Sequence, residues 1–135
     1  MIPEIILWNQ ILERIQKVFW KDVIIINSTI PDAKKTKYFL DILHNKAKII
    51  LWTRSALFYP YNNLGLVIMD EEHDDSYISD NSPRYNSGTI ADEIADLTGI
   101  KLIRASGTPS IKSMYQGIKW KYEVINLLEK YKKEG

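Results

Sequence analysis

A series of short apolar runs constrains the fold of this chain more than any other feature. The clearest run is Val23-Ile24-Ile25-Ile26, which is β-branched and does not alternate with polar residues. Such a run is typical of a strand that is buried on both faces, as in a parallel sheet. Runs of the same kind predict further strands at residues 5–7, 47–52, 64–69 and 101–105.

The segments between these strands carry helical patterns. Apolar residues recur at helical spacing over residues 10–19, and residues 89–97 are amphipathic, with Gly99 close behind. Pro31 suits the first turn of a helix that runs to about Asn45. Because strands alternate with helices, the sequence predicts a three-layer α/β domain with a mostly parallel sheet.

Two segments do not fit this alternation. Residues 74–88 are polar and turn-rich, which predicts a long loop, and long loops within compact domains tend to be functional. The tail at residues 119–133 has apolar residues at the spacing of a helical stripe, yet residues 122–125 also fit a strand. Both alternatives for the tail remain open at the level of sequence.

Composition excludes several classes of protein. With 135 residues the chain is long enough for one domain with a real core. Its net charge of +1 gives no broad electrostatic field for nucleic acid, and the lack of cysteine excludes disulfides and thiolate metal sites. The apolar runs are too short to span a bilayer, and the first residues lack the pattern of a signal peptide. We therefore expect a cytoplasmic protein with no membrane partner.

The strand at residues 64–69 leads into an acidic sequence, Asp70-Glu71-Glu72-His73. Phosphoryl transfer to water needs a metal ion that neutralises phosphate charge and a group that orients the attacking water. Asp70 could hold magnesium through water molecules, because magnesium keeps much of its hydration in proteins. Glu71 could then face the attacking water. The alternative is a solvated acidic turn without a function.

A polar turn, Ser106-Gly107-Thr108-Pro109-Ser110, follows the strand at residues 101–105. Ligands bind beyond the carboxyl ends of parallel strands, so we expect this turn and Asp70 to share one rim of the domain. His73 would then bridge towards Ser106 or Thr108, unless it is an ordinary surface histidine. The turn also suits the start of a short helix, in which Thr108 or Ser110 is the N-cap and the proline lies in the first helical turn.

Two other places carry residues suited to nucleic acid. Thr53-Arg54-Ser55 follows the strand at residues 47–52, and its hydroxyl and guanidinium groups could grip a phosphodiester backbone. Arg84 stands beside Tyr85 in the polar 74–88 segment and could contact DNA or nucleotide. The alternatives are a helix start with a solvated Arg54 and a loop with a solvated Arg84.

Together these residues resemble part of the first motor lobe of the primosomal replication-restart DNA helicases, the primosomal protein N-prime family of superfamily-two DExH helicases. Order and spacing agree over most of residues 2–118. The DExH motif alone indicates only the superfamily, and the additional motifs indicate the narrower family. The matching stretches are Pro3-Glu4-Ile5, Thr53-Arg54-Ser55-Ala56-Leu57-Phe58, Asn63 to Asp74, Ser76-Tyr77, Pro83-Arg84-Tyr85 and Ser106-Gly107-Thr108-Pro109-Ser110.

The resemblance implies a RecA-like (P-loop NTPase-like) lobe and a set of residue roles. Asp70 would correspond to the magnesium carboxylate and Glu71 to the residue that activates water, while Glu72 and His73 complete the catalytic motif. The turn at residues 106–110 would couple hydrolysis to strand movement. The residues along the path of DNA would be Pro3, Glu4, Thr53, Arg54, Ser55 and Arg84.

The chain departs from the family pattern at several positions. Trp52 stands where the family has a small residue, Trp8-Asn9 replaces Thr-Pro, and Gly107 replaces alanine. After Pro-Arg-Tyr the family continues with His-Ala-Arg-Asp, whereas this chain has Asn86-Ser87-Gly88-Thr89. No segment matches G-x-x-x-x-G-K-[ST], so the phosphate-binding loop of nucleotide hydrolases is missing from this sequence.

We therefore expect residues 1–118 to be a partial first lobe without the phosphate-binding loop. Residues 119–135 would be a tail or the start of a linker to a missing second lobe. The intact motor would use Mg²⁺ and ATP, and neither would bind tightly to this chain alone. Its partners would be single-stranded or forked DNA and primosome proteins. Apolar surface exposed where strands are missing would favour self-association of the chain.

Two other interpretations remain open. The chain could be a non-catalytic DNA-binding or protein-docking module that keeps a degenerate helicase lobe as its scaffold, and the departures at Trp52 and Asn86 favour this alternative. It could also be an unrelated α/β domain in which the acidic turn has arisen by chance.

Overall fold

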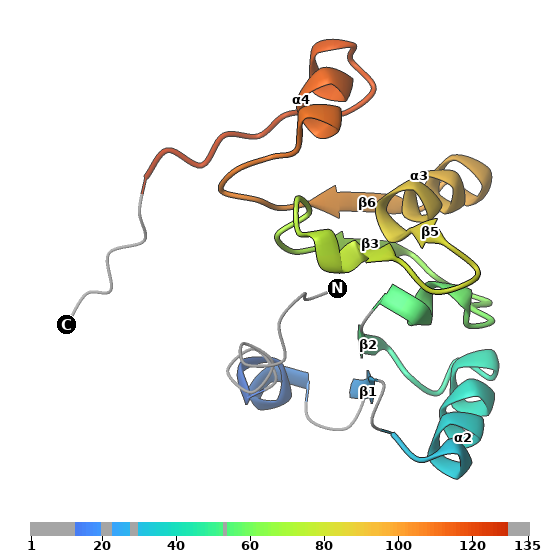
Figure 1. The fold of residues 1–135 in the computed structure, drawn as a ribbon. Helices are drawn as coiled ribbons and strands as arrows, with labels where there is room; N and C mark the ends of the chain where they lie inside the picture. Colours follow the sequence, from blue (N-terminus) through green and yellow to red (C-terminus); the bar gives the residue numbers. More distant parts are fainter. Residues whose placement is uncertain (1–12, 20–22, 28–29, 53, 130–135) are drawn as a thin grey trace.

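The computed structural model describes residues 13–19, 23–27, 30–52 and 54–129, which form a mixed α/β structure (Figure 1). Residues 13–19 are helical. The remaining elements are β1 (Val23–Ile26), α2 (Asp32–Leu43), β2 (Ile49–Trp52), the 3-10 helix η1 (Arg54–Phe58), β3 (Leu66–Met69), the 3-10 helix η2 (Asp75–Tyr77), β4 (Ile78–Ser79), β5 (Tyr85–Asn86), α3 (Ser87–Thr98), β6 (Lys101–Arg104) and α4 (Ile111–Ile118).

The described strands form three separate pairs. β1 pairs with β2 and β3 pairs with β6, both in parallel, whereas β4 and β5 form an antiparallel pair. The predicted α/β class is confirmed, and the predicted parallel pairing holds for the two longer pairs. The described strands do not join into one sheet, so the three-layer RecA-like arrangement stays a prediction.

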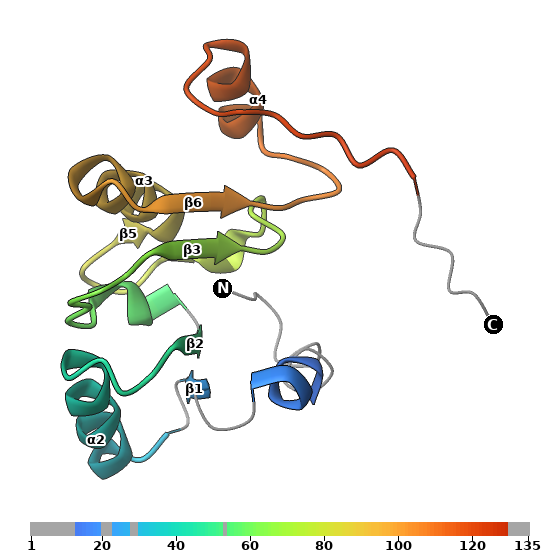
Figure 2. The same cartoon turned by 180° about the vertical axis from the view of Figure 1, so that it is seen from behind.

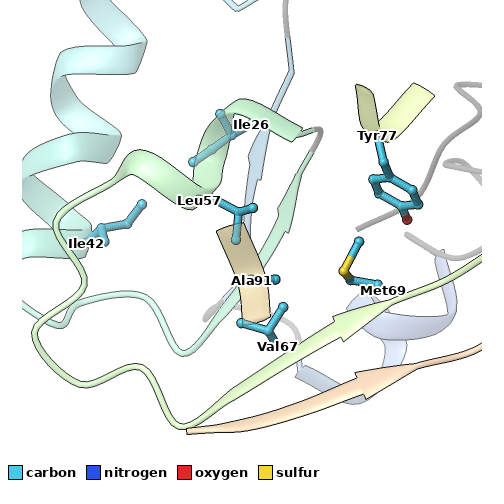
Figure 3. Packing of buried hydrophobic residues seen from close by; sticks show 7 residues of the cluster. All are labelled: Ile26, Ile42, Leu57, Val67, Met69, Tyr77 and Ala91. Carbon is cyan, nitrogen blue, oxygen red and sulfur yellow. The ribbon is translucent and has the colours of Figure 1, made fainter. Parts of the chain in front are cut away.

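A single apolar cluster joins the two parallel pairs. Leu57 of η1 lies between Ile26 of β1 and Val67 of β3, and Ala91 of α3 packs against the same group (Figure 3). η1 therefore lies between the β1–β2 pair and the β3–β6 pair, in both views of the ribbon (Figures 1 and 2). The buried members of the cluster are Ile26, Ile42, Leu57, Val67, Met69, Tyr77 and Ala91.

The predicted helices agree with the structure within a few residues at their ends. α2 begins after Pro31, which is its N-cap residue rather than part of its first turn. α3 begins earlier than predicted because the Asn86 side chain accepts a hydrogen bond from the Thr89 amide at 3.1 Å and caps the helix. Gly99 ends α3 with a φ of +73°, a left-handed conformation that glycine adopts without strain.

The 74–88 segment is not the open loop that its composition predicts. Asp74 caps η2 by accepting a hydrogen bond from the Ser76 amide at 2.7 Å, and Tyr77 is buried in the core. The segment then forms the short β4–β5 hairpin. A single buried aromatic residue thus anchors a stretch whose composition is otherwise typical of a loop.

Other predicted elements are shifted or fall outside the description. The strand predicted at residues 5–7 and the start of the helix predicted at residues 10–19 lie outside the described residues. Residues 119–129 form neither a helix nor a strand, so both alternatives for this part of the tail are wrong. Over those residues the large apolar side chains remain exposed: Val124, Ile125, Leu127 and Leu128.

α4 lies beyond β6, and the segment after it leads away from the strands (Figures 1 and 2). Ser110 is the N-cap of α4, as one of the two predicted alternatives, and accepts a hydrogen bond from the Ser113 amide at 3.2 Å. Pro109 precedes this cap rather than lying in the first turn. Among the described helices, none has the length and apolar character needed to cross a bilayer.

Candidate functional site

The carboxyl ends of β3 and β6 form one rim of the structure. Met69 and Arg104 are neighbours in the parallel register of the two strands. The pairing continues past the strand ends, because the Ala105 amide donates to the Met69 carbonyl at 2.8 Å and the Glu72 amide donates to the Ala105 carbonyl at 3.1 Å. The acidic sequence and the 106–110 turn therefore lie side by side, as the sequence predicts.

A tight turn separates Asp70 from the residues that follow it. Glu71 has a φ of +47°, in the left-handed region that residues other than glycine rarely adopt. The Glu71 amide donates to Asp70 Oδ1 at 3.1 Å, and the Tyr77 hydroxyl donates to the Asp70 carbonyl at 2.5 Å. Burial and the nearby Asp70 carboxylate raise the pKa of Tyr77, so its hydroxyl stays protonated and continues to donate. These contacts hold the turn in its unusual conformation.

His73 joins the acidic sequence to the neighbouring strand end. Its Nδ1 lies 2.7 Å from Ser106 Oγ, and its Nε2 lies 3.3 Å from Thr108 Oγ1. A hydroxyl can donate or accept a hydrogen bond, so each ring nitrogen has a suitable partner in either tautomer. Glu71 also approaches the ring, with Oε2 3.5 Å from Nδ1. The predicted bridge from His73 to the hydroxyl turn is confirmed, and it involves both candidate hydroxyls.

Glu72 is turned inward and holds the N-terminus of α4. Its Oε1 accepts a hydrogen bond from the Ser110 amide at 2.6 Å, and its Oε2 accepts from the hydroxyls of Ser110 and Ser113 at 3.1 Å and 2.9 Å. Burial by itself would raise the pKa of Glu72. The hydrogen bonds from Ser110 and Ser113, with the positive charge of Arg104, outweigh that effect and lower the pKa. The geometry gives this carboxylate a positioning role.

The predicted DNA-contact residues are not all found together. Pro3, Glu4 and Thr53 lie outside the described residues. Arg54 turns its Nη1 towards the backbone, where it donates to the carbonyls of Ser76 and Ile78 at 3.1 Å and 2.5 Å. Ser55 is exposed on the surface. Arg84 is also exposed and donates from Nε to the Asp80 carbonyl at 3.3 Å. Contact with DNA stays a prediction for these residues.

Sequence analysis missed the residues that support the rim from behind. Arg104 stands at the end of β6, with its guanidinium 2.8 Å from Asp92 Oδ1 of α3 and 3.5 Å from Glu72 Oε2. The Tyr122 hydroxyl donates to the same Asp92 oxygen at 2.7 Å. Burial and this hydrogen bond raise the pKa of Tyr122 to about 12. The available signal was an arginine at the end of a strand with an apolar centre, at a position that shares a face with Met69.

Asp70 fits the requirements for a hydrated magnesium ion better than Glu72 does. No group of histidine and carboxylate residues numbering three or more is placed to hold a metal within the described part of the chain. Magnesium that keeps its waters and binds phosphates needs only one or two carboxylates from the protein. Asp70 is half-buried at the strand end. Glu72 does not fit, because both its oxygens are engaged by α4.

Comparison with known proteins finds close relatives with one shared name. The chain is 40% identical over 132 residues to "Replication restart protein PriA" of Rickettsia prowazekii (strain Madrid E), an alignment that covers 98% of this chain and 20% of that protein. It is 38% identical over 119 residues to the protein of the same name from Helicobacter pylori (strain J99 / ATCC 700824), covering 88% and 19%. For the Bacillus subtilis (strain 168) protein the identity is 31% over 127 residues, covering 94% and 16%.

The chain thus spans about a fifth of the length of the curated relatives that it matches. No family model matches the sequence. The relatives confirm the resemblance to the replication-restart family that the sequence motifs indicate.

Proposed function

Because this chain is related in sequence to about a fifth of replication restart protein PriA, we propose that it is a partial first motor lobe of an ATP-dependent DNA helicase. Residues 1–118 would belong to the lobe, and residues 119–135 would be a tail or the start of a linker. The intact motor would act on single-stranded or forked DNA, with primosome proteins as partners, in the cytoplasm.

One observation carries the proposal: His73 connects the acidic end of β3 to the hydroxyl turn after β6. Its two ring nitrogens meet Ser106 and Thr108 at 2.7 Å and 3.3 Å. In a motor, a change at the phosphate end of the site must reach the segment that moves the strand. Contiguous hydrogen bonds between rigid elements are a physical route for such coupling. The turn at residues 106–110 would be the receiving segment.

The acidic residues would divide the chemistry among them. Asp70 would hold Mg²⁺ through water molecules, and Glu71 would orient the attacking water. When bound, magnesium would neutralise charge on the phosphates. Glu72 would position the N-terminus of α4, where its carboxylate already lies. His73 would transmit displacements of the acidic turn to Ser106 and Thr108.

The chain by itself would bind ATP weakly and hydrolyse it at no useful rate. The sequence lacks the G-x-x-x-x-G-K-[ST] loop, whose backbone amides and lysine cradle the phosphates. A single carboxylate such as Asp70, which would hold magnesium through water, contributes little to the free energy of nucleotide binding without that cradle. Titration of this chain with a fluorescent ATP analogue should show no saturation in the low micromolar range. Saturation in that range would contradict this part of the proposal.

The decisive test uses the longest polypeptide that the reading frame around this sequence encodes. That protein should hydrolyse ATP in a manner stimulated by single-stranded DNA. Asp70→Asn and Glu71→Gln should each lower kcat by at least about a hundredfold while DNA binding is retained. Glu129→Gln, a change in an exposed tail carboxylate, is the matched control. A protein without DNA-stimulated hydrolysis would refute the helicase proposal.

A second candidate function is a non-catalytic protein-docking module. It is favoured by α4, whose apolar residues Ile111, Met114, Tyr115 and Ile118 repeat at helical spacing and are all exposed. The same polypeptide distinguishes the two functions. A docking module would show no ATP hydrolysis, and would lose partner binding when Ile111 and Ile118 are both changed to serine.

A further inference from the structure

Arg104 is the point where the rim is connected to the rest of the domain. It is the last residue of β6 and shares the buried face of the strand pair with Met69. Its side chain is only 11% exposed. The guanidinium contacts two carboxylates on different elements, Glu72 Oε2 at 3.5 Å and Asp92 Oδ1 at 2.8 Å. A flat guanidinium with several donors is suited to hold two such groups at once.

The position of the guanidinium is determined by α3. Nη2 donates to the Gly88 carbonyl at 2.7 Å as well as to Asp92. A Cβ atom at position 88 would lie 3.0 Å from Nη1 and 3.4 Å from Nη2. A side chain at position 88 would therefore require the guanidinium, and Asn86 Oδ1 at 3.1 Å, to shift by a few tenths of an ångström. This gives a physical reason for glycine here, where the family pattern has arginine.

The segment after α4 closes the other side of the same group. The ring of Tyr122 lies 5.5 Å from the guanidinium carbon of Arg104, a distance suited to a cation–π contact. The Tyr122 hydroxyl donates to Asp92 Oδ1 at 2.7 Å, and Lys112 Nζ lies 3.7 Å from Asp92 Oδ2. Arg104 is thus held between α3 and residues that follow the 106–110 turn in the chain.

We propose that Arg104 is a positioning residue, which acts through Glu72 to hold the 106–110 turn and α4 in register with Asp70. The contacts form a continuous chain. Arg104 fixes the Glu72 carboxylate, and Glu72 accepts the Ser110 amide and hydroxyl at the start of α4. Without the cation, the buried carboxylate loses its charge partner and moves towards water, because an unpaired buried charge is costly. The turn that His73 contacts would then lose its anchor.

Amide hydrogen exchange in this chain tests the proposal without any assumption about its activity. Arg104→Met keeps the length of the side chain and removes its charge. It should raise the exchange rate of the Ser110 amide by about tenfold or more, because that amide depends on Glu72. The Gly99 amide, which donates to the Ala95 carbonyl at the far end of α3, should change by less than about twofold. Lys101→Met, at an exposed cation on the same strand, is the matched control and should change neither amide.

Gly88→Ala provides a second and independent variant. It removes no charge, and alanine favours a helix more than glycine does. Its Cβ would nonetheless displace the guanidinium, and the Ser110 amide should again exchange faster than in the wild type. Arg104→Lys should restore part of the protection, because lysine keeps the charge but cannot span both carboxylates.

The outcomes separate a positioning role from simple loss of stability. If all amides of Arg104→Met and Gly88→Ala exchange faster by one common factor, or if Ser110 is unaffected in both, the proposal is wrong. If Arg104→Met does not fold, the Gly88→Ala comparison decides.

The consequence for catalysis rests on the proposed helicase function and has its own measurement. In the longer polypeptide, Arg104→Met should lower kcat for DNA-stimulated ATP hydrolysis by about tenfold, with KM for ATP within about twofold of the wild type. Equal values of kcat would show that the position of the turn does not limit hydrolysis, and would overturn this consequence. A wild-type protein without hydrolysis would refute the proposed function instead, while the exchange pattern would still decide the role of Arg104.

Discussion

The two faces of the β3–β6 pair are both mostly apolar, yet they have opposite surroundings. One face carries Val67 and Met69, both fully buried in the core, and it ends at Arg104. The other face carries Leu66 and Ile103, which are 43% and 49% exposed. Continuous apolar strands predict cover on both faces, and the described residues cover only one.

The buried face of the strand pair therefore organises the rim, whereas the exposed face is available for association with other apolar surfaces. On the buried face, apolar packing brings Arg104 and Met69 together, and the polar contacts of Glu72 extend from that end. On the exposed face, apolar area remains in contact with water and favours association with other apolar surfaces. The predictions below test whether the two faces really differ in this way.

The largest expected effect comes from the buried face. Met69→Ala should lower the free energy of unfolding by about 3 kcal/mol, because it removes a fully buried side chain and leaves a cavity. Leu66→Ala, at the start of the same strand on the exposed face, should cost less than about 1 kcal/mol. Urea denaturation followed by tryptophan fluorescence measures both. Equal losses would mean that the two faces do not differ in burial.

The next effect concerns two adjacent carboxylates on the rim. Glu72→Ala should lower the free energy of unfolding by about 2 kcal/mol, since it removes an acceptor of several hydrogen bonds and leaves Arg104 without one of its partners. Glu71→Ala, the matched control at the more exposed neighbour, should change it by less than about 0.5 kcal/mol. The same denaturation experiment applies. A larger loss for Glu71 than for Glu72 would contradict the assigned positioning role.

The pH dependence of stability gives a smaller and more specific effect. Because the folded protein lowers the pKa of Glu72, the ionised carboxylate stabilises the fold at pH values above its ordinary pKa. That contribution should be lost as the pH falls from about 4.5 through the lowered pKa of the folded state. Thermal melts between pH 7 and pH 3 should therefore show a smaller acid loss of stability in Glu72→Gln than in the wild type.

Asp74 adds to the same pH dependence of stability and serves as an internal comparison. Its pKa is lowered by the hydrogen bonds from the Ser76 side chain and amide. Part of the acid sensitivity should therefore survive in Glu72→Gln and should decrease further in the double variant with Asp74→Asn. An unchanged acid profile in the Glu72 variant would contradict the lowered pKa.

The smallest effect on stability, and the one most specific to the exposed face, should come from Ile103→Lys. A charge at this position should leave the fold intact and reduce self-association of the chain, because it interrupts exposed apolar area. Sedimentation velocity over a range of protein concentrations measures the change. Thr98→Lys, outside this face at an exposed site, controls for added charge. A wild-type chain that stays monomeric at all concentrations would contradict the prediction.

Local pattern was sufficient for the longer strands and helices before Gly99 and for the principal contact of the candidate site. The β-branched run at residues 23–26 and the amphipathic stretch that ends at Gly99 both form what they predict. The polar turns after β3 and β6 meet because parallel strands end on the same side of a sheet, which needs no knowledge of side-chain positions. A bridge from His73 to Ser106 or Thr108 could therefore be predicted, and the structure shows contacts with both.

Long-range packing decided what the same local patterns could not. Residues 74–88 have the composition of a loop, and burial of Tyr77 gives them structure. Glu72 stands in the acidic sequence after β3, and its contacts with Ser110, Ser113 and Arg104 turn it inward. The tail has an apolar stripe, but its apolar residues from Val124 to Leu128 stay exposed, and its described part forms no helix.

The sequence by itself determined where the longer strands and helices form and which strand ends carry acidic and hydroxyl groups, because these properties depend on residues close together in the chain. Only the tertiary structure decided that Arg104 pairs with Glu72 and Asp92 beside Gly88. Such a contact joins residues that are distant in sequence, and its geometry depends on how every intervening element packs. For that reason the supporting role of Arg104 does not follow from the sequence motifs and is evident only from its contacts in the fold.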